Sequence, residues 1–264
     1  MNTEVSQSPS GSTSRVANLL LKIGALLLTS GSNSRRISVN MLRIANAWGY
    51  NLELFSSFTG IMITLTDKEN PLDTVTRFQR VPMHGVNFAI VSSISILSWD
   101  VHNEQMEIEE VEAKVEKIRE IPHYPRWVLF LGIGLACASL CLLMNGDYKN
   151  AGIAFIASVA GLYCRQLLTK RRFNVLISVL AASFVTSIIA GLDVLMHIGK
   201  TPESTLATSV LYLVPGVPLL NAIMDLVEGH IPTAIARGIY GACIVLSIAI
   251  GMILSMLIIG FNNY

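Results

Sequence analysis

The sequence predicts an integral membrane protein, with an α+β N-terminal domain followed by an all-α bundle of five transmembrane helices. Only 14% of the 264 residues are charged, against about 25% in ordinary soluble domains, and 52% are hydrophobic. The charges are also unevenly placed. Residues 1–126 hold 12 Lys and Arg and 13 Asp and Glu, whereas residues 127–264 hold 7 and 5. The second half is therefore too apolar to fold in water.

The change in composition divides the chain near residue 126. Residues 1–14 are polar and rich in serine, which is typical of a disordered tail. We expect residues 15–125 to form a cytoplasmic α+β domain and residues 126–264 to form the membrane domain. The apolar run at 19–28 is too short to span a bilayer and has no cleavage-site pattern, so we expect no signal peptide. The net charge of +1 argues against a nucleic-acid partner.

Apolar periodicity and breaker residues locate the elements of the N-terminal domain. The expected helices lie at 15–30, 34–49, 84–97 and 104–121, and the expected strands at 52–55, 60–65 and 74–81. Gly31 should end the first helix, and Ser34 should cap the second, which stops at Gly49. The last helix carries one apolar stripe between charged residues, so we expect it to lie on the sheet.

The N-terminal domain carries few residues that suggest chemistry. Arg35 and Arg36 follow a glycine turn at a predicted helix start, where they form either an anion site or a solvated first turn. We find no P-loop, Rossmann glycine pattern, catalytic triad or metal-ligand spacing in the sequence, so we predict no catalytic residues, metal or cofactor. The four cysteines lie in the apolar half and are expected to pack as small side chains rather than form a disulfide.

Five apolar stretches of nearly 20 residues follow, at 127–144, 151–168, 173–192, 206–226 and 238–261. Basic residues concentrate between the second and third stretches, and the positive-inside rule places that connection in the cytoplasm. The N-terminal domain is then expected inside and the C-terminus outside. The stretches are rich in Gly, Ala and Ser, which predicts a closely packed bundle.

The fourth stretch is interrupted. Pro215, Gly216 and Pro218 remove two N–H donors near the expected middle of the membrane, and broken helices of transporters often form the substrate site. Asn221 and Asp225 follow within two turns. An ionisable group at the bilayer centre costs at least ~2.5 kcal/mol. Asp225 is therefore either a functional group or a helix-end residue that reaches cytoplasmic water.

Three more residues are candidates for this site. His230 and Arg237 follow in the short segment after the fourth stretch, where Arg237 is a candidate partner for Asp225 or for an anionic solute. Asp193 ends the third stretch and is either a further site residue or an interface residue.

The interrupted segment resembles the threonine/serine exporter family (ThrE type). From Leu213 to His230, with Arg237 beyond, it reads Pro-Gly-x-Pro followed by Asn, Asp, Gly-His and Arg. Gly31 with Arg35-Arg36-Ile37 and Gly49, and Tyr124-Pro125 before the first span, are also similar to that family. Ser38 departs from it, because the family often has an acidic residue there.

The resemblance implies more than the residues show. Family members occur as one long chain of about ten spans or as two proteins, and this chain resembles the longer, YjjP-like subunit of the split form. A smaller all-membrane YjjB-like subunit is then the expected partner, in an oligomer surrounded by lipid of the bacterial inner membrane. Fused members export threonine and serine, whereas split members are linked to succinate and related dicarboxylates. We expect export of such a small polar metabolite, driven by the proton motive force.

The resemblance also suggests roles for the candidate residues. Asp225 would bind a proton or a substrate amine, Asn221 would donate hydrogen bonds, and Arg237 would hold a carboxylate. Pro215, Gly216 and Pro218 would shape the site. Two other interpretations stay open, which are a regulatory or scaffold membrane subunit and a membrane-bound hydrolase.

Overall fold

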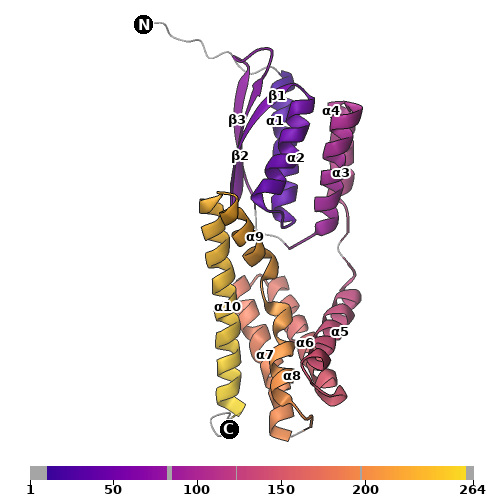
Figure 1. Ribbon diagram of the computed structural model, residues 1–264, viewed down its shortest axis with the longest axis vertical. Helices are drawn as coiled ribbons and strands as arrows, with labels where there is room; N and C mark the ends of the chain where they lie inside the picture. Colours follow the sequence, from indigo (N-terminus) through magenta and orange to yellow (C-terminus); the bar gives the residue numbers. More distant parts are fainter. Residues whose placement is uncertain (1–10, 82–84, 123, 197, 260–264) are drawn as a thin grey trace. The chain divides into compact units, whose positions relative to one another are not determined.

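The computed structural model describes residues 11–81, 85–122, 124–196 and 198–259. Its contacts divide the chain into two compact units (Figure 1). The first unit contains Met1–His123 and Val217–Gly238, and the second contains Tyr124–Gly216 and Ile239–Tyr264. The expected single division near residue 126 therefore differs from the structure, because Val217–Gly238 groups with the N-terminal domain.

The first unit is built on a small antiparallel sheet with strand order β1-β2-β3. Its strands are β1 (Tyr50–Ser57), β2 (Gly60–Asp67) and β3 (Thr74–Arg80). Alternate residues of β2 face the core, where Ile61, Ile63 and Leu65 are fully buried. Leu52 of β1 lies opposite Leu65 and is buried with it. The three predicted strands are confirmed, and their apolar alternation gives the sheet one covered face.

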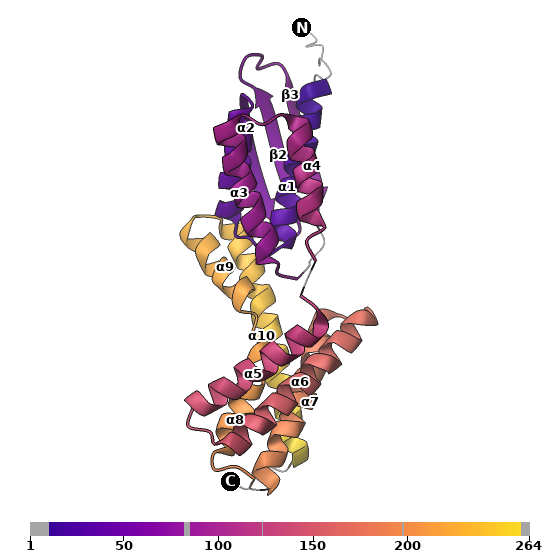
Figure 2. The same ribbon diagram turned by 90° about the vertical axis from the view of Figure 1, so that its right-hand side faces the viewer.

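Four helices cover that face in two layers (Figure 2). They are α1 (Gly11–Thr29), α2 (Ser34–Ala47), α3 (Phe88–Glu104) and α4 (Ile108–Arg119). α1 packs on β2 and β3, α2 packs on β1, and α3 and α4 form the next layer on α1 and α2. The prediction that the fourth helix lies on the sheet is wrong. Its buried residues Val111 and Val115 pack within the helical layers, because α1 and α2 already cover the sheet.

Three predicted boundaries also change. α1 begins at Gly11, so residues 11–14 belong to a helix and not to a tail. Buried Thr13 donates a hydrogen bond of 2.7 Å to Asp73 and helps to fix this first turn. The cap of α2 is Asn33 rather than Ser34, since the Asn33 side chain accepts from the Arg36 N–H at 2.9 Å. α3 continues to Glu104, well beyond 97, and its expected start at 84 lies outside the described residues.

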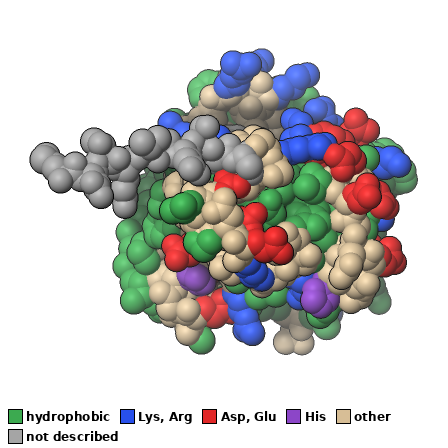
Figure 3. Space-filling view, turned by 90° about the horizontal axis from the view of Figure 1, so that it is seen from above, with side chains coloured by type: hydrophobic (Ala, Val, Ile, Leu, Met, Phe, Trp, Pro, Cys, Tyr) green, Lys and Arg blue, Asp and Glu red, His purple; other side chains and the backbone are tan. Residues whose placement is uncertain are grey.

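Ion pairs join α4 to α1 at the surface. Arg15 pairs with Glu109 and with Glu112, the latter at 2.7 Å, and Lys22 pairs with Glu116. The hydrogen bond from Arg15 lowers the pKa of Glu112, and the hydrogen bond from Lys22 lowers the pKa of Glu116. Acidic and basic side chains also lie side by side on the end of the first unit seen in Figure 3.

These shifts predict an acid-sensitive contact between α1 and α4. A lowered carboxyl pKa stabilises the folded state above the ordinary glutamate pKa of about 4.3, and this contribution is lost as pH falls through the folded-state pKa. Amide hydrogen exchange in α4, corrected for its intrinsic rate, should therefore rise below about pH 4.3. Glu112→Gln should raise it already at neutral pH. Glu110→Gln is the matched control, because Glu110 pairs with Lys114 of the same helix. Exchange in α4 that is independent of pH would contradict this prediction.

The second unit is a helical bundle. It contains α5 (Arg126–Leu143), α6 (Tyr148–Lys170), α7 (Val175–Met196), α8 (Pro202–Ser209), the short η1 (Leu211–Leu213) and the later part of α10 (Ile231–Ile259). Within the described ranges, α5, α6, α7 and α10 are each long and apolar enough to cross a membrane. Pro202–Leu213 and α9 (Gly216–Val227) pass the same test together as one interrupted span. The described part of the chain thus contains four or five candidate spans, as expected of a multi-pass membrane protein.

The fifth predicted span belongs to a longer helix that starts before it. α10 begins at Ile231 rather than at 238. Pro232 is well suited to its first turn, because proline has no N–H and the N–H groups of a first turn have no partner within the helix. Arg237 is therefore part of a helix and not of a connecting segment. The predicted end of this span at 261 lies outside the described residues.

Small residues let the helices of the second unit approach closely. α6 packs along both α5 and α7, and its buried face carries Ala154, Ala157 and Gly161. A Cβ atom added to Gly161 would lie 3.0 Å from the Ala182 carbonyl oxygen and would overlap side chains nearby. The predicted close packing is confirmed at this crossing.

Candidate functional site

The turn between α1 and α2 presents backbone polar groups of both signs. Gly31 adopts a left-handed φ of +87°, and the Ser32 N–H reaches back to the Leu27 carbonyl at 3.1 Å, which is a Schellman ending of α1. Asn33 then starts α2. The carbonyls of Gly31 and Ser32 lie beyond the hydrogen-bonded carbonyls of α1. The Ser34 N–H lies in the first turn of α2, where N–H groups have no partner within the helix.

A second turn of the same kind joins α9 to α10. Gly229 has a φ of +82°, and the His230 N–H donates to the Asp225 carbonyl at 2.8 Å. α10 starts directly afterwards at Ile231. The turn brings the last polar residue of α9, Asp225, next to Arg237, which lies two turns into α10. We name Val217–Gly238 the α9–α10 hairpin.

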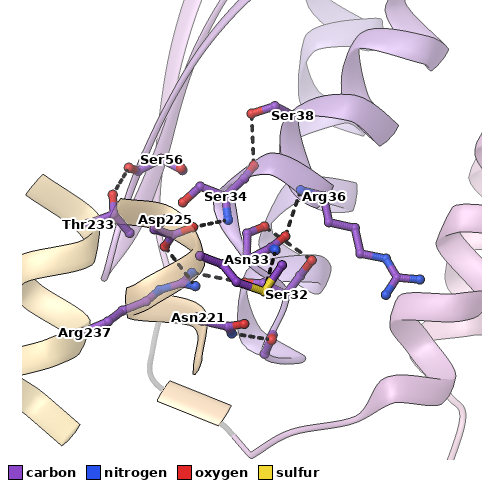
Figure 4. Close-up of polar contacts among 12 residues, drawn as sticks. Ser32, Asn33, Ser34, Arg36, Ser38, Ser56, Asn221, Asp225, Thr233 and Arg237 are labelled. Carbon is purple, nitrogen blue, oxygen red and sulfur yellow. Dashed lines mark hydrogen bonds and ion pairs between the residues drawn. The ribbon is translucent and has the colours of Figure 1, made fainter. Parts of the chain in front are cut away.

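The α9–α10 hairpin binds the α1–α2 turn through three side chains (Figure 4). The bonds run from Asn221 Nδ2 to the Gly31 oxygen at 2.8 Å, from Arg237 Nη2 to the Ser32 oxygen at 3.0 Å, and from the Ser34 N–H to Asp225 Oδ1 at 2.9 Å. The amide of Asn221 and the cation of Arg237 therefore donate to backbone carbonyls, and the anion of Asp225 accepts from a backbone N–H. The N-terminal end of α2 also favours the Asp225 carboxylate electrostatically.

The hairpin is held to the sheet as well. The Thr233 hydroxyl donates to the Ser56 carbonyl at the end of β1, at 2.7 Å, and both residues are buried. This contact fixes the first turn of α10 independently of the charged residues.

Asp225 and Arg237 form a buried ion pair. Arg237 Nη1 lies 3.1 Å from Asp225 Oδ2, and the two side chains are 5% and 0% exposed. Their attraction is Coulombic, since no hydrogen bond joins Nη1 to Oδ2. Asp225 Oδ2 and Arg237 Nη1 have each other as ion-pair partners, and neither makes a hydrogen bond to a described residue. The nearby Ser34 Oγ is also buried without one. Buried polar atoms usually have hydrogen-bond partners, so this cluster indicates a site that could take a further hydrogen bond.

The predicted site residues fall into separate groups. The hairpin contains Asn221, Asp225, Arg237 and also Pro218, which lies in the first turn of α9. The alternative that Asp225 reaches water is wrong, because Asp225 is fully buried. The described contacts of His230 are made by its backbone. Pro215 and Gly216 belong to the second unit, where they lie at the interruption between η1 and α9.

Arg35 and Arg36 do not join the ion pair. Arg35 Nη1 lies 3.5 Å from Glu228 of the turn between α9 and α10, and Arg36 Nε donates to Ser95 of α3 at 3.3 Å. Figure 4 shows the Arg36 side chain extending away from Asp225. The start of α2, predicted to be either an anion site or a solvated first turn, thus binds the carboxylate of Asp225 itself.

Asp193 lies in the second unit within a polar cluster of its own. Its carboxylate accepts from Asn150 Nδ2 and from the Thr205 hydroxyl, each at 2.6 Å, and from the Gly199 N–H at 2.9 Å. Asp193, Asn150 and Thr205 are fully buried. These bonds join α6, α7 and α8. No cationic side chain in the described part of the chain pairs with Asp193.

Sequence reasoning missed the partners of both clusters. The α1–α2 turn contributes backbone atoms of Gly31, Ser32 and Ser34, which have no residue-type signature. Asn150 follows Asp147 at the spacing of a capping box, and that signal identifies it as a helix-start residue. Nothing in the sequence points to its second contact, with Asp193.

Comparison with known proteins identifies the family. The family model described as "Putative threonine/serine exporter" matches residues 18–259, which is nearly the whole chain. The chain belongs to this family. The matched range includes the whole α9–α10 hairpin and the α1–α2 turn. No solved structure shows a significant match.

Curated relatives of two lengths are similar to the chain. It is 33% identical to the probable succinate transporter subunit YjjP of Klebsiella aerogenes over 251 residues, covering 94% of this chain and 96% of that protein. It is 31% identical to the Escherichia coli protein of the same name over 250 residues, with the same coverage. It is 23% identical to the threonine/serine exporter of Corynebacterium glutamicum over 234 residues, covering 84% of this chain but only 47% of that protein.

Proposed function

We propose that this chain is the larger subunit of a secondary exporter that moves a dicarboxylate such as succinate out of the bacterial cytoplasm, and that Arg237 and Asp225 are its charge-binding site. The buried ion pair with unused hydrogen-bonding atoms carries this proposal. The higher identity to succinate transporter subunits than to a threonine/serine exporter supports a dicarboxylate rather than an amino acid.

Arg237 has the chemistry that a carboxylate substrate needs. A guanidinium binds carboxylates through directed hydrogen bonds, and Arg237 Nη1 has none in the described structure. A substrate carboxylate that binds Nη1 displaces Asp225 from its counter-charge. A buried carboxylate without a counter-charge favours its protonated form. Capture of substrate is therefore coupled to uptake of one proton by Asp225.

This coupling leaves the electrical component of the proton motive force to drive export, because the proton itself moves outward against its own gradient. A dicarboxylate that leaves together with one proton still carries one net negative charge outward. An interior-negative membrane potential favours that movement by about 2.3 kcal/mol for each 100 mV. The electrical component then drives export while the proton regulates binding.

Opening of the hairpin gives access to the pair. Arg237 and Asp225 are shielded from solvent, so substrate reaches them when the α9–α10 hairpin separates from the α1–α2 turn. The bond of Asn221 to the turn and the bond of Thr233 to the sheet are among those that oppose this separation. We place the first unit in the cytoplasm. The end of α6 and the turn after it carry four basic residues, which favour the cytoplasmic side, namely Arg165, Lys170, Arg171 and Arg172. Because α5 and α6 cross the membrane in opposite directions, the first unit lies on that same side.

A second subunit completes the transporter in this proposal. The chain spans about half the length of the Corynebacterium exporter, and the word "subunit" in the name of the YjjP relatives implies a partner. A smaller all-membrane protein would supply the remaining half. Because the chain's own bundle has at most five described spans, the substrate path is expected to lie along both subunits.

The test is reconstitution of this chain, its smaller partner, or both, into vesicles with the first unit facing the lumen and labelled succinate or threonine inside. The pair should release succinate faster than threonine, and a lumen-negative potential should accelerate release. Release of threonine alone would overturn the dicarboxylate assignment. Full activity of the smaller subunit by itself would instead make this chain a regulatory or scaffold subunit.

Arg237→Lys separates charge from geometry in the same assay. Lysine keeps the positive charge but loses the planar fork that holds both Ser32 and a carboxylate. We expect succinate release to fall at least about tenfold, since a single charge-assisted hydrogen bond contributes about 1.5–3 kcal/mol. Release at the wild-type rate would argue against a bound carboxylate at Arg237.

A further inference from the structure

A basic groove runs along the first unit, separate from the Asp225–Arg237 pair. It has a volume of about 450 Å³ and lies between α2, α3 and α9. Its charged lining consists of Arg35, Arg36 and Arg43 of α2, opposed by Glu228, which directly follows α9. Three guanidinium groups face one carboxylate, so the groove carries a net charge of about +2 at neutral pH.

The guanidinium groups are held in place. Arg43 Nη1 donates to Ser98 Oγ at 2.6 Å, and its guanidinium carbon stacks 3.7 Å from the centre of the Trp99 ring. Arg36 is oriented by Ser95. Arg35 reaches Glu228 only at 3.5 Å, and its side chain is 71% exposed. Each arginine therefore has donors left for a ligand, and two of the three are already positioned.

One wall of the groove continues into an exposed apolar face. Leu220, Ile223, Met224 and Val227 of α9 follow the i, i+3, i+4, i+7 spacing of a single helix face, and each is 46–82% exposed. Met224 also lines the groove. α9 is part of an interrupted membrane span, so this face is suited to contact hydrocarbon. Basic and apolar surfaces thus meet at Met224, as they do where a protein crosses the level of lipid headgroups.

We propose that this groove binds the phosphodiester of an anionic phospholipid, with Arg35 and Arg36 on the phosphate and the acyl chains along the exposed face of α9. A soluble anion would use the arginines but would leave the apolar face uncovered. The exposed ring of Trp99 fits the same level, because tryptophan is enriched at membrane interfaces.

The position of the groove connects lipid to the transport site. Glu228, which lies three residues after Asp225, contacts Arg35, and Asn33, which caps α2, lines the groove beside Met224. A phosphate that takes Arg35 from Glu228 removes one of the links between α2 and the α9–α10 hairpin. Anionic lipid is therefore expected to ease separation of the α9–α10 hairpin from the α1–α2 turn.

The test measures lipid binding and needs no transport activity. Full-length protein is delipidated in mild detergent and exchanged into nanodiscs of equal parts phosphatidylglycerol and phosphatidylcholine. Native mass spectrometry of protein released from them then counts the retained lipids. The wild type should keep phosphatidylglycerol preferentially. The Arg35→Gln/Arg36→Gln variant should keep about fivefold less, because each basic residue adds to the attraction of anionic lipid.

A matched variant controls for charge alone. Arg77→Gln/Arg80→Gln removes the same two charges from exposed positions on β3 and should bind lipid like the wild type. Thermal unfolding would first verify that all three proteins are folded. Equal retention of lipid by the three would then overturn the proposal. Displacement of lipid by millimolar inorganic phosphate or succinate would also overturn it, since the groove would then be a site for soluble anions.

Discussion

Replacing Arg237 by methionine is expected to destabilise the protein by about 3–5 kcal/mol, because the Asp225 carboxylate is left buried without its counter-charge. The Ser32 carbonyl also loses the only hydrogen bond that the described side chains donate to it. Thermal unfolding in detergent measures the loss. Glu228→Gln is the matched control on the same hairpin. Its partner Arg35 is largely exposed, so this change should stay within about 0.5 kcal/mol of the wild type.

Combining Arg237→Met with Asp225→Asn separates stability from function. Removing both charges restores much of the lost stability, since the cost of the single change arises from one unpaired buried charge. Asparagine retains an oxygen that accepts from the Ser34 N–H. Succinate release should stay abolished in this double variant, because it can neither hold a carboxylate nor take up a proton. Wild-type release from a stable double variant would show that the pair has only a structural role.

The distribution of elements was largely predictable from local pattern. The three strands follow from apolar alternation, and the helices of the second unit follow from runs of about 20 apolar residues, since periodicity and hydropathy are properties of short segments. The surface that an amphipathic helix covers is not such a property. The stripe with Val111 and Val115 marks α4 as half-buried without showing whether a sheet or other helices lie beneath it.

The residues of the candidate site were predictable, but their surroundings were not. Asn221 and Asp225 were recognised because polar groups are costly in an apolar stretch, and Arg237 was recognised as a candidate partner for Asp225. Their partners are mainly backbone atoms of a turn about 190 residues earlier, exposed by the left-handed conformation of Gly31. The same contacts explain why Val217–Gly238 groups with the first unit rather than with the bundle. Long-range pairing of this kind requires the tertiary structure.

Asp193 is expected to act by joining helices rather than by binding substrate. Asp193→Ala would leave Asn150 Nδ2, Thr205 Oγ1 and the Gly199 N–H without their buried acceptor. Each unsatisfied buried group costs about 1–3 kcal/mol, so the total loss should be several kcal/mol. Thermal unfolding of the full-length protein should show a strongly lowered midpoint. Thr205→Val should lose part of this stability, whereas Thr205→Ser, which keeps the hydroxyl, should lose little.

The carboxylates of Asp193 and Asp225 differ in the number of oxygens that accept hydrogen bonds. Both oxygens of Asp193 accept hydrogen bonds, while Asp225 keeps one oxygen with none from the described residues. A saturated carboxylate has no site for a ligand, so changes at Asp193 should lower the amount of folded protein and leave succinate release per folded molecule unchanged. When Asp225 and Arg237 are changed together, the amount of folded protein should be largely kept, whereas succinate release per folded molecule should be lost. A fully stable Asp193→Ala protein that releases no succinate would reassign Asp193 to the transport path.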